Sequence, residues 1–221
     1  MTRKFNNDDI VRMNSVLRHR FGNQISGIKN AVSLMAEELE GKVSPSIAEY
    51  FPLIDKECGS MDETLKRMTL LFDPVPQGLA MNILDLLANS TRALHSRYPK
   101  IQIKSSFSDG LSGVQVGDSN ALSVAVREVA WNAAESGGSE VHFECGVHGD
   151  KLHLQIADNG KGIVADKIGL VFDPFYTAKS RHIGIGLSIA LKMVEDLGGS
   201  INVSNGNGGG VVVLMILPAV S

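Results

Sequence analysis

Three short segments in the second half of the chain contain residues suited to binding a flat ring and a phosphate. The sequence Asp-Asn-Gly-Lys-Gly at residues 158–162 follows an alternating apolar run. A carboxylate at a strand end can accept a hydrogen bond from an exocyclic amine, and glycines beside it let backbone approach a ring or a phosphate closely. Alone, this segment is equally typical of an ordinary turn. Residues 128–134 before it and residues 182–187 after it make the ordered trio a stronger signal.

Glu128 and Asn132 belong to a helix that we expect to start at Asp118 or Ser119 and to end near Glu135. The pair lies one turn apart and about 120° from the expected core face, so both side chains could reach one ligand. An Asn amide oxygen is a hard ligand suited to Mg²⁺ between phosphates, and a carboxylate beside it could accept a proton or hold the metal's water. A merely solvated face is the alternative. The expected core face consists of Leu122, Val126, Val129 and Ala133.

The ordered trio resembles the N box and the two glycine boxes of the gyrase, chaperone and histidine-kinase ATPase superfamily. The resemblance runs from about residue 79 to residue 218 and implies a Bergerat-type ATP-binding domain with Mg²⁺ as cofactor. It implies that Asp158 contacts the adenine amine, while Gly160 and Gly162 free the loop beneath the base. Gly184 and Gly186 open a helix whose free N–H groups and positive dipole end can meet the phosphates, and we include the adjacent Leu187 in this site.

The sequence at residues 171–179 is similar to the F box of that superfamily and its following T-x-K. This resemblance implies that Thr177 and Lys179 belong to the nucleotide site, with Lys179 as a phosphate contact. We expect Phe172 and Phe175 mainly to pack in the core. Elsewhere in this half we expect helices at 84–96, 118–135 and 184–197 and strands at 80–83, 101–107, 114–116, 140–147, 151–158, 200–203 and 211–217.

Two long helices are expected before residue 73, the first at residues 7–41 with Gly41 as its C-cap. With 100° per residue, one stripe within about 40° of Phe21 contains Ile10, Leu17, Ile25, Ile28, Val32, Met35 and Leu39. The second helix, residues 45–72, has apolar positions spaced alternately four and three, at Ile47, Phe51, Ile54, Cys58, Met61, Leu65, Met68 and Phe72. Two such hairpins that bury their stripes together form a four-helix bundle, so we predict a homodimer.

His19 projects about 160° from Phe21 and Asn23 about 200°, opposite the apolar stripe. From the helix alone, a solvated surface histidine is the commoner explanation. The sequence Leu-Arg-His-Arg-Phe-Gly-Asn-Gln-Ile at residues 17–25 resembles the phosphoacceptor box of sensor histidine kinases, in which Asn or Thr follows the histidine by four residues. This resemblance implies that His19 is the phosphoacceptor and that Asn23 belongs to the catalytic site.

Several positions depart from the commonest form of that family. Arg20 and Gln24 stand where an acidic residue and a proline are frequent, and a cation cannot be the base. The H-R-x-x-N form, with Glu128 four residues before the N-box Asn, is similar to the HWE-like branch, and it leaves Glu128 as the candidate base or metal ligand. His182 stands where a glycine usually starts the second glycine box, Glu135 occupies a position that is often basic, and Val211 replaces a frequent Thr. We expect these departures to weaken ATP affinity without abolishing ATP binding.

The composition is that of an ordinary globular protein. The net charge of −3 gives no electrostatic indication of a nucleic-acid partner, and no apolar run approaches the ~20 residues of a membrane-spanning helix. We therefore expect a cytoplasmic location, with sensing in another protein or in a longer chain. The two cysteines, Cys58 and Cys145, lack metal-ligand or redox spacing and are expected to be free and buried.

Together these patterns predict an α + α/β protein. Residues 1–73 form a dimerisation and phosphotransfer hairpin, residues 74–79 a linker and residues 80–221 an α/β sandwich ATP-binding domain. The predicted activity is that of a two-component sensor histidine kinase: transfer of the ATP γ-phosphoryl group to His19, and then to an aspartate of a response-regulator receiver domain. Two alternatives remain, a non-catalytic phosphotransfer scaffold with a degenerate ATPase-like domain, and an ATPase of the gyrase or chaperone type, in which His19 has no role.

Overall fold

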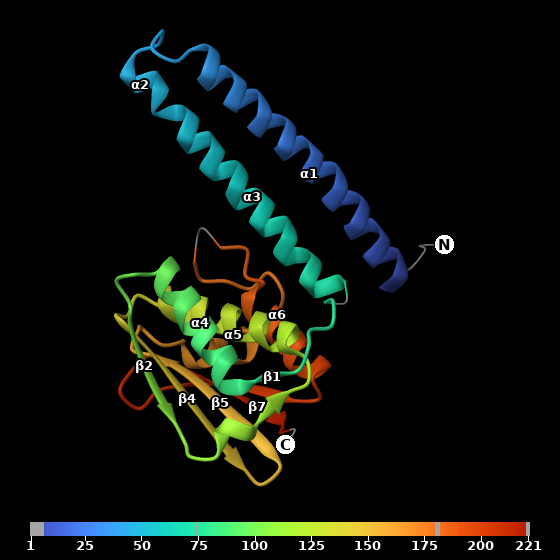
Figure 1. Cartoon of the computed structure of the whole chain (residues 1–221), viewed down its shortest axis with the longest axis vertical. Helices are drawn as coiled ribbons and strands as arrows, with labels where there is room; N and C mark the ends of the chain where they lie inside the picture. The colour runs from blue at the N-terminus through green and yellow to red at the C-terminus, as the bar shows by residue number, and fades with distance from the viewer. Residues whose placement is uncertain (1–6, 74, 180–181, 220–221) are drawn as a thin grey trace. The chain divides into compact units, whose positions relative to one another are not determined.

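The computed structural model describes residues 7–73, 75–179 and 182–219, with side chains from Asn14 onward. Residues 1–6, Pro74, 180–181 and 220–221, parts of the expected hairpin, linker and ATP-binding domain, lie outside the described residues, as does the Ile10 side chain. The chain divides into two compact units, Met1–Pro74 and Val75–Ser221. Each unit is described separately (Figure 1).

The first unit is a helical hairpin, as predicted. Helix α1 (Asn7–Glu38) packs against α3 (Tyr50–Phe72), and the short α2 (Pro45–Ala48) precedes α3. Helix α1 ends three residues earlier than expected, and Gly41 adopts φ +68° in the turn that follows. The second helix is interrupted at Glu49, because Pro52 has no N–H to donate to the carbonyl four residues before it.

The apolar stripe of α1 is only partly used inside the hairpin. Ile25 is buried, and Val32 and Leu39 are half-buried at the same seven-residue spacing. Phe21, at the centre of the expected stripe, is instead exposed, as is Ile28 with 49% of its surface accessible. Further exposed apolar side chains of the hairpin are Val16, Leu17, Leu34, Met35, Ile47, Tyr50, Leu53, Ile54 and Met61. Within one chain, therefore, α3 covers only one flank of the stripe.

The second unit is an α/β sandwich. Its sheet has the strand order β2-β4-β5-β7-β6, in which β2 runs parallel to β4 and the remaining pairs are antiparallel. Helices α4, α5 and α6 lie on one face of this sheet (Figure 1). The strands are β2 (Gln102–Phe107), β4 (Glu140–His148), β5 (Lys151–Asp158), β6 (Ser200–Asn205) and β7 (Val211–Pro218), and the helices are α4 (Ile83–Arg97), α5 (Ser119–Ala134) and α6 (Gly186–Asp196).

Smaller elements complete this unit. Strands β1 (Met81–Asn82) and β3 (Gln115–Val116) pair in a separate two-stranded sheet, and two 3₁₀ helices, η1 (Leu111–Gly113) and η2 (Ala165–Leu170), lie in connections. The sequence pattern did not predict η1 or η2. Part of the expected linker is held against α5: the Asp118 carboxylate caps the helix and also accepts a hydrogen bond from the Gly78 N–H at 2.9 Å.

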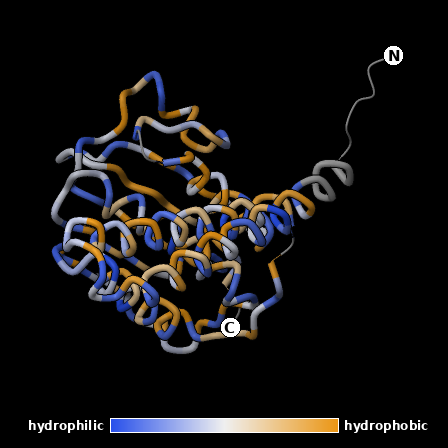
Figure 2. Tube along the Cα trace, turned by 90° about the horizontal axis from the view of Figure 1, so that it is seen from above, coloured by the Kyte–Doolittle hydropathy of each residue, from blue (hydrophilic) through white to orange (hydrophobic). Residues whose placement is uncertain are grey.

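The core lies between the helices and the sheet. Alternate residues of the strands face inward, among them Val141, Phe143, Leu154, Ile156 and Met215, and all are buried. All four predicted core residues of α5 are buried as well. Figure 2 shows apolar and polar positions alternating along the helices, as amphipathic packing requires. Cys58 and Cys145 are free and buried, as predicted. Among the described residues, no helix is long and apolar enough to cross a membrane.

Candidate nucleotide site

Asn132 and Lys179 meet although 47 residues separate them. The Lys179 ammonium donates to the Asn132 amide oxygen at 3.0 Å and approaches the Asn132 backbone carbonyl at 3.4 Å. Asn132 lies near the end of α5, whereas Lys179 lies in the connection between η2 and α6. Thr177 stabilises this connection, because its hydroxyl accepts a hydrogen bond from the Lys179 N–H at 3.0 Å. The two residues assigned to metal and phosphate therefore lie side by side.

Glu135 is the second neighbour of Lys179. Its Oε2 lies 3.7 Å from the Lys179 Nζ and 3.5 Å from the His182 Nδ1. Its Oε1 accepts a hydrogen bond from the Tyr98 hydroxyl at 2.5 Å. We call these five residues, Asn132, Glu135, Lys179, His182 and Tyr98, the Lys179 cluster. Two departures noted in the sequence, Glu135 and His182, are thus in contact with each other and with the lysine.

Burial and nearby charges shift the pKa of Lys179 in opposite directions. Burial lowers the pKa of Lys179, while the charges of Glu135 and Asp158 raise it. Burial raises the pKa of Tyr98 to about 12, and its hydrogen bond to Glu135 adds to the rise. The Tyr98 phenol therefore remains a hydrogen-bond donor throughout the neutral range.

Asp158 ends β5 and begins a tightly packed loop. Its Oδ1 accepts a hydrogen bond from the Gly160 N–H at 2.8 Å. A Cβ at Gly160 would lie 2.2 Å from the Ser136 hydroxyl oxygen, so only glycine fits there. Asn159 fixes the other side of the loop, because its amide oxygen accepts the N–H groups of Ser139 and Glu140 at 2.8 and 3.0 Å. These hydrogen bonds hold the loop after β5 against the start of β4.

Gly162 and Gly184 both adopt positive φ, at +73° and +75°. A Cβ at Gly184 would lie 2.4 Å from the Tyr176 carbonyl oxygen. The Gly184 carbonyl accepts a hydrogen bond from the N–H of Phe175 at 2.7 Å. Gly184 therefore brings the loop before α6 against the segment that contains Thr177 and Lys179, and α6 then starts at Gly186 with Leu187 half-buried.

Phe175 is not a packing residue. It is 55% exposed and has φ +70°, an uncommon conformation for a residue with a bulky side chain. The hydrogen bond from its backbone N–H to the Gly184 carbonyl holds it in the loop. A pattern of apolar residues cannot predict such a backbone contact. Phe172 is half-buried.

Glu128 lies deeper than the helical wheel indicated. Only 1% of its surface is accessible, and its Oε1 accepts a hydrogen bond from the Arg127 Nη2 at 3.0 Å. Arg127 in turn lies over the Trp131 ring, with Arg97 over the same ring. Helices α4 and α6 both pack against α5, so few positions of α5 remain open to a ligand. Asn132, one turn later, is only half-buried.

His19 lies in the other unit, on α1. It is exposed, and the Asn23 Nδ2 lies 3.3 Å from its Nε2. Its exposure is as expected for a side chain opposite the apolar stripe. This pair presents an accessible imidazole nitrogen beside an amide.

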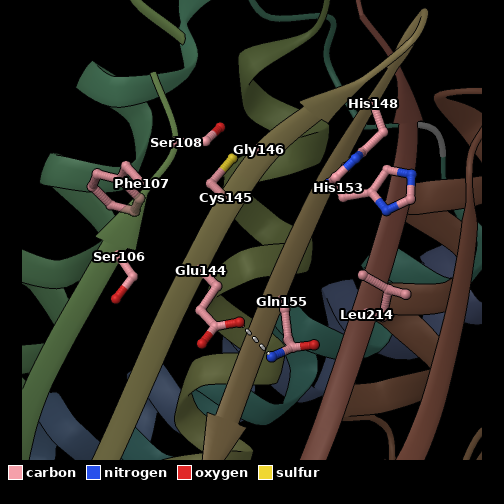
Figure 3. Close-up of a pocket in the computed structure, with 10 residues that line it drawn as sticks. All are labelled: Ser106, Phe107, Ser108, Glu144, Cys145, Gly146, His148, His153, Gln155 and Leu214. Carbon is pink, nitrogen blue, oxygen red and sulfur yellow. Dashed lines mark hydrogen bonds between the residues drawn. The ribbon is translucent and has the colours of Figure 1, made fainter. Parts of the chain in front are cut away.

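Two open hollows of the second unit lie away from these loop residues. One of about 540 Å³ lies on the sheet face opposite the helices, where the Gln155 amide donates to Glu144 at 2.8 Å and the rings of His148 and His153 are 4.6 Å apart (Figure 3). A second, of about 600 Å³, involves α4 and β2. Neither contains Asn132, Asp158 or Gly184. The candidate nucleotide site is defined by the loop contacts described above.

The donors near Asn132 fit a Mg²⁺ ion held mainly by nucleotide phosphates. The described residues contain no group of three His, Cys, Asp or Glu side chains that could hold a metal alone. The Asn132 amide oxygen is a hard donor, and a cation already lies at it, the Lys179 ammonium. Asn132 could therefore serve as the single protein ligand of such an ion.

Sequence reasoning missed Tyr98 and did not connect Glu135 with His182. Tyr98 follows α4 and lies 37 residues from Glu135, and no local pattern marks it.

Comparisons with known proteins point to one family. Residues 117–221 match the family described as histidine kinase-, DNA gyrase B-, and HSP90-like ATPase. The sensor histidine kinase ZraS of Escherichia coli (strain K12) is 26% identical over 206 residues, which cover 90% of this chain and 43% of ZraS. The alginate biosynthesis sensor protein KinB of Pseudomonas aeruginosa is 26% identical over 228 residues, which cover 94% of this chain and 37% of KinB. The chain thus spans less than half the length of these relatives.

Solved structures agree in fold. The mycobacterial sensor histidine kinase MprB matches with a TM-score of 0.57 and 25% identity over 64% of this chain and 97% of that one. Full-length ShkA in complex with AMPPNP matches with a TM-score of 0.78 and 20% identity over 95% of this chain and 46% of that one. The second match includes the helical hairpin as well as the sandwich. Residues 117–221 therefore belong to the histidine kinase-, DNA gyrase B- and HSP90-like ATPase family, and the chain has the make-up of a sensor histidine kinase catalytic core.

Proposed function

We propose that this chain transfers the γ-phosphoryl group of ATP to His19 and then to an aspartate of a response-regulator receiver domain. The observation that carries the proposal is an exposed His19–Asn23 pair on a helical hairpin, in the same chain as an ATPase-family domain. The relatives are named sensor kinases, and ShkA was solved with AMPPNP. The non-catalytic scaffold has less support, because the loop contacts at Asp158 and Gly184 are intact.

In the proposed site, Asp158 accepts a hydrogen bond from the adenine amine, and Gly160 and Gly162 let the loop lie close to the base. Lys179, Thr177 and the start of α6 at Gly184, Gly186 and Leu187 face the phosphates. Mg²⁺, with Asn132 as protein ligand, would neutralise charge on the transferring phosphoryl group. Phosphoryl transfer depends mainly on positioning and charge neutralisation, and these residues can supply both.

Two carboxylates have distinct proposed roles. Glu128 remains our candidate for the base or for a metal or water ligand, although it must act from a buried position beside Arg127. A base must come within hydrogen-bond reach of the proton, yet such contacts often tighten only in the substrate complex. Asp158 serves recognition alone.

We further propose that the hairpin forms a homodimeric four-helix bundle. The exposed apolar side chains of α1, α2 and α3 form a surface larger than monomers usually leave open. Two hairpins that pack through these side chains would bury them and leave His19 accessible.

Labelling with γ-labelled ATP tests the transfer. Wild-type protein should acquire an acid-labile, base-stable phosphoryl group, and His19→Ala should lose it with nucleotide affinity nearly unchanged. Asp158→Asn should weaken ATP binding with the acceptor intact. Labelling that persists in His19→Ala would move the acceptor to another histidine and refute the assignment.

Addition of a receiver domain tests the second transfer. Label on the full chain should move to the receiver domain, and substitution of the receiver's aspartate should prevent this. Retention of the label in the presence of several receiver domains would contradict the partner assignment.

A further inference from the structure

Glu135 places a negative charge beside the Lys179 ammonium in the proposed phosphate site. It is the C-cap residue of α5, three residues after Asn132. Its Oε2 faces both the Lys179 ammonium, at 3.7 Å, and the His182 ring, at 3.5 Å. Phosphates that bind at Lys179 would therefore approach a carboxylate of the same sign.

We propose that Glu135 is an internal counter-ion that competes with the nucleotide's phosphates for Lys179 and His182, and so weakens phosphate binding without affecting recognition of adenosine. This inference rests on the proposed function, because it requires the nucleotide to bind at the Lys179 cluster. It makes Glu135 a determinant of affinity rather than a catalytic residue.

Tyr98 fixes the carboxylate in this position. Its hydroxyl donates to Glu135 Oε1 at 2.5 Å, which leaves Oε2 directed toward Lys179 and His182. A surface carboxylate without such an anchor could rotate away when phosphates arrive. With the anchor, withdrawal of Glu135 requires loss of a hydrogen bond to a charged group, which is stronger than a neutral one.

The opposite effect, that Glu135 assists binding by keeping Lys179 charged, is the main competing interpretation. Burial lowers the pKa of Lys179 and the Glu135 charge opposes this. A bound nucleotide carries several negative charges, which would themselves keep the ammonium protonated. The support from Glu135 is then redundant, while its repulsion of the phosphates remains. Removal of the charge should therefore strengthen binding.

Glu135→Gln isolates the charge from the shape. The amide oxygen of Gln can still accept the Tyr98 hydrogen bond, so the contact between α5 and the segment after α4 is kept. Glu135→Asp keeps the charge. Glu144→Gln is a matched control, because it removes one negative charge from the sheet face opposite the helices, where Glu144 pairs with Gln155.

Calorimetric titration of the full chain with ATP and with adenosine tests the inference. We expect Glu135→Gln to bind ATP about fivefold more tightly than wild type, the upper end of the effect of one charge in a partly exposed cluster. Adenosine affinity should change less than about twofold, because Glu135 does not contact Asp158. Glu144→Gln should bind ATP as wild type does, and Glu135→Asp, which keeps the charge on a shorter side chain, should bind ATP less tightly than Glu135→Gln does.

The outcomes separate the two proposals. If wild type binds ATP and Glu135→Gln binds it equally or more weakly, the counter-ion inference is wrong and the proposed function stands. If adenosine and ATP affinities rise together, Glu135 does not act on the phosphates, and the inference is also overturned. If no variant binds ATP, the proposed nucleotide site fails, and the inference fails with it.

Discussion

Three consecutive glycines before β7 provide a graded test of how the loop at Asp158 is held. Gly208 has an ordinary φ and open space where a Cβ would lie. Gly209 has φ +97°, and the nearest atom to a Cβ there would be 3.8 Å away. Gly210 has φ +74°, and a Cβ there would lie 1.8 Å from the Asp158 carbonyl oxygen. Alanine at each position therefore adds one further perturbation to the previous one.

The expected magnitudes follow from these geometries. At Gly208, alanine should stabilise by about 0.4–1 kcal/mol, because it restricts only the unfolded chain. At Gly209, the left-handed backbone costs about 1–2 kcal/mol and outweighs that gain, so we expect a net loss of about 1 kcal/mol. At Gly210, the same backbone cost combines with about 1–3 kcal/mol of overpacking against Asp158, for a net loss of about 2–4 kcal/mol.

Urea unfolding followed by tryptophan fluorescence measures this series, because the single tryptophan, Trp131, reports on the second unit. ATP affinity supplies a second readout. Gly210→Ala should also weaken ATP binding, since Asp158 has to shift, whereas Gly209→Ala should retain it. Equal stability of Gly210→Ala and Gly208→Ala would refute the packing argument. A destabilised Gly210→Ala that binds ATP normally would refute the assignment of Asp158 to adenine.

Three further predictions concern the hairpin, the base and the buried thiol. Ile28→Glu should convert a dimer to a monomer in sedimentation at micromolar concentration, because it would bury an unpaired charge in the proposed interface. The control Ser26→Glu, on the other side of α1, should remain dimeric. A monomeric wild type would contradict the bundle. Glu128→Gln should slow phosphorylation of His19 by ~10² or more with little change in ATP affinity, and a wild-type rate would exclude Glu128 as the base. Burial raises the pKa of Cys145 from 9.0 to about 12, so its contribution to stability is complete below about pH 9 and declines as pH rises toward 12. The difference in urea midpoint between wild type and Cys145→Ala should therefore shrink over that range, and a constant difference would contradict the burial argument.

Local sequence signals predicted the sandwich well. Strand β5 has the predicted bounds, because inward residues such as Leu154 and Ile156 alternate with outward ones along its length. Helix α5 starts where the Asp118 carboxylate accepts the N–H groups of Asn120 and Ala121, a signal contained within a few residues. These elements were predictable because the forces that define them act between near neighbours in the chain.

Positions that contact several elements were less predictable. The stripe of α1 has one flank against α3 and another exposed, and periodicity alone cannot assign Ile25 to the first and Phe21 to the second. Glu128 shows the same limit. The wheel places it off the expected core face, but only 1% of its surface is accessible, and the wheel does not include α4 and α6, which pack against α5.

Long-range polar contacts mark the final limit. Asn132 was recognised from its motif, but the arrival of Lys179 from 47 residues away, and of Tyr98 beside Glu135 from 37 residues away, depends on how α4, α5 and the loop before α6 meet. In the sequence, Glu135 is a departure that should weaken ATP binding. In the fold, it lies between the Lys179 ammonium and the His182 imidazole and accepts a hydrogen bond from the Tyr98 hydroxyl. The motif therefore predicts the chemistry of the pocket, whereas its affinity depends on charges that only the tertiary structure brings together.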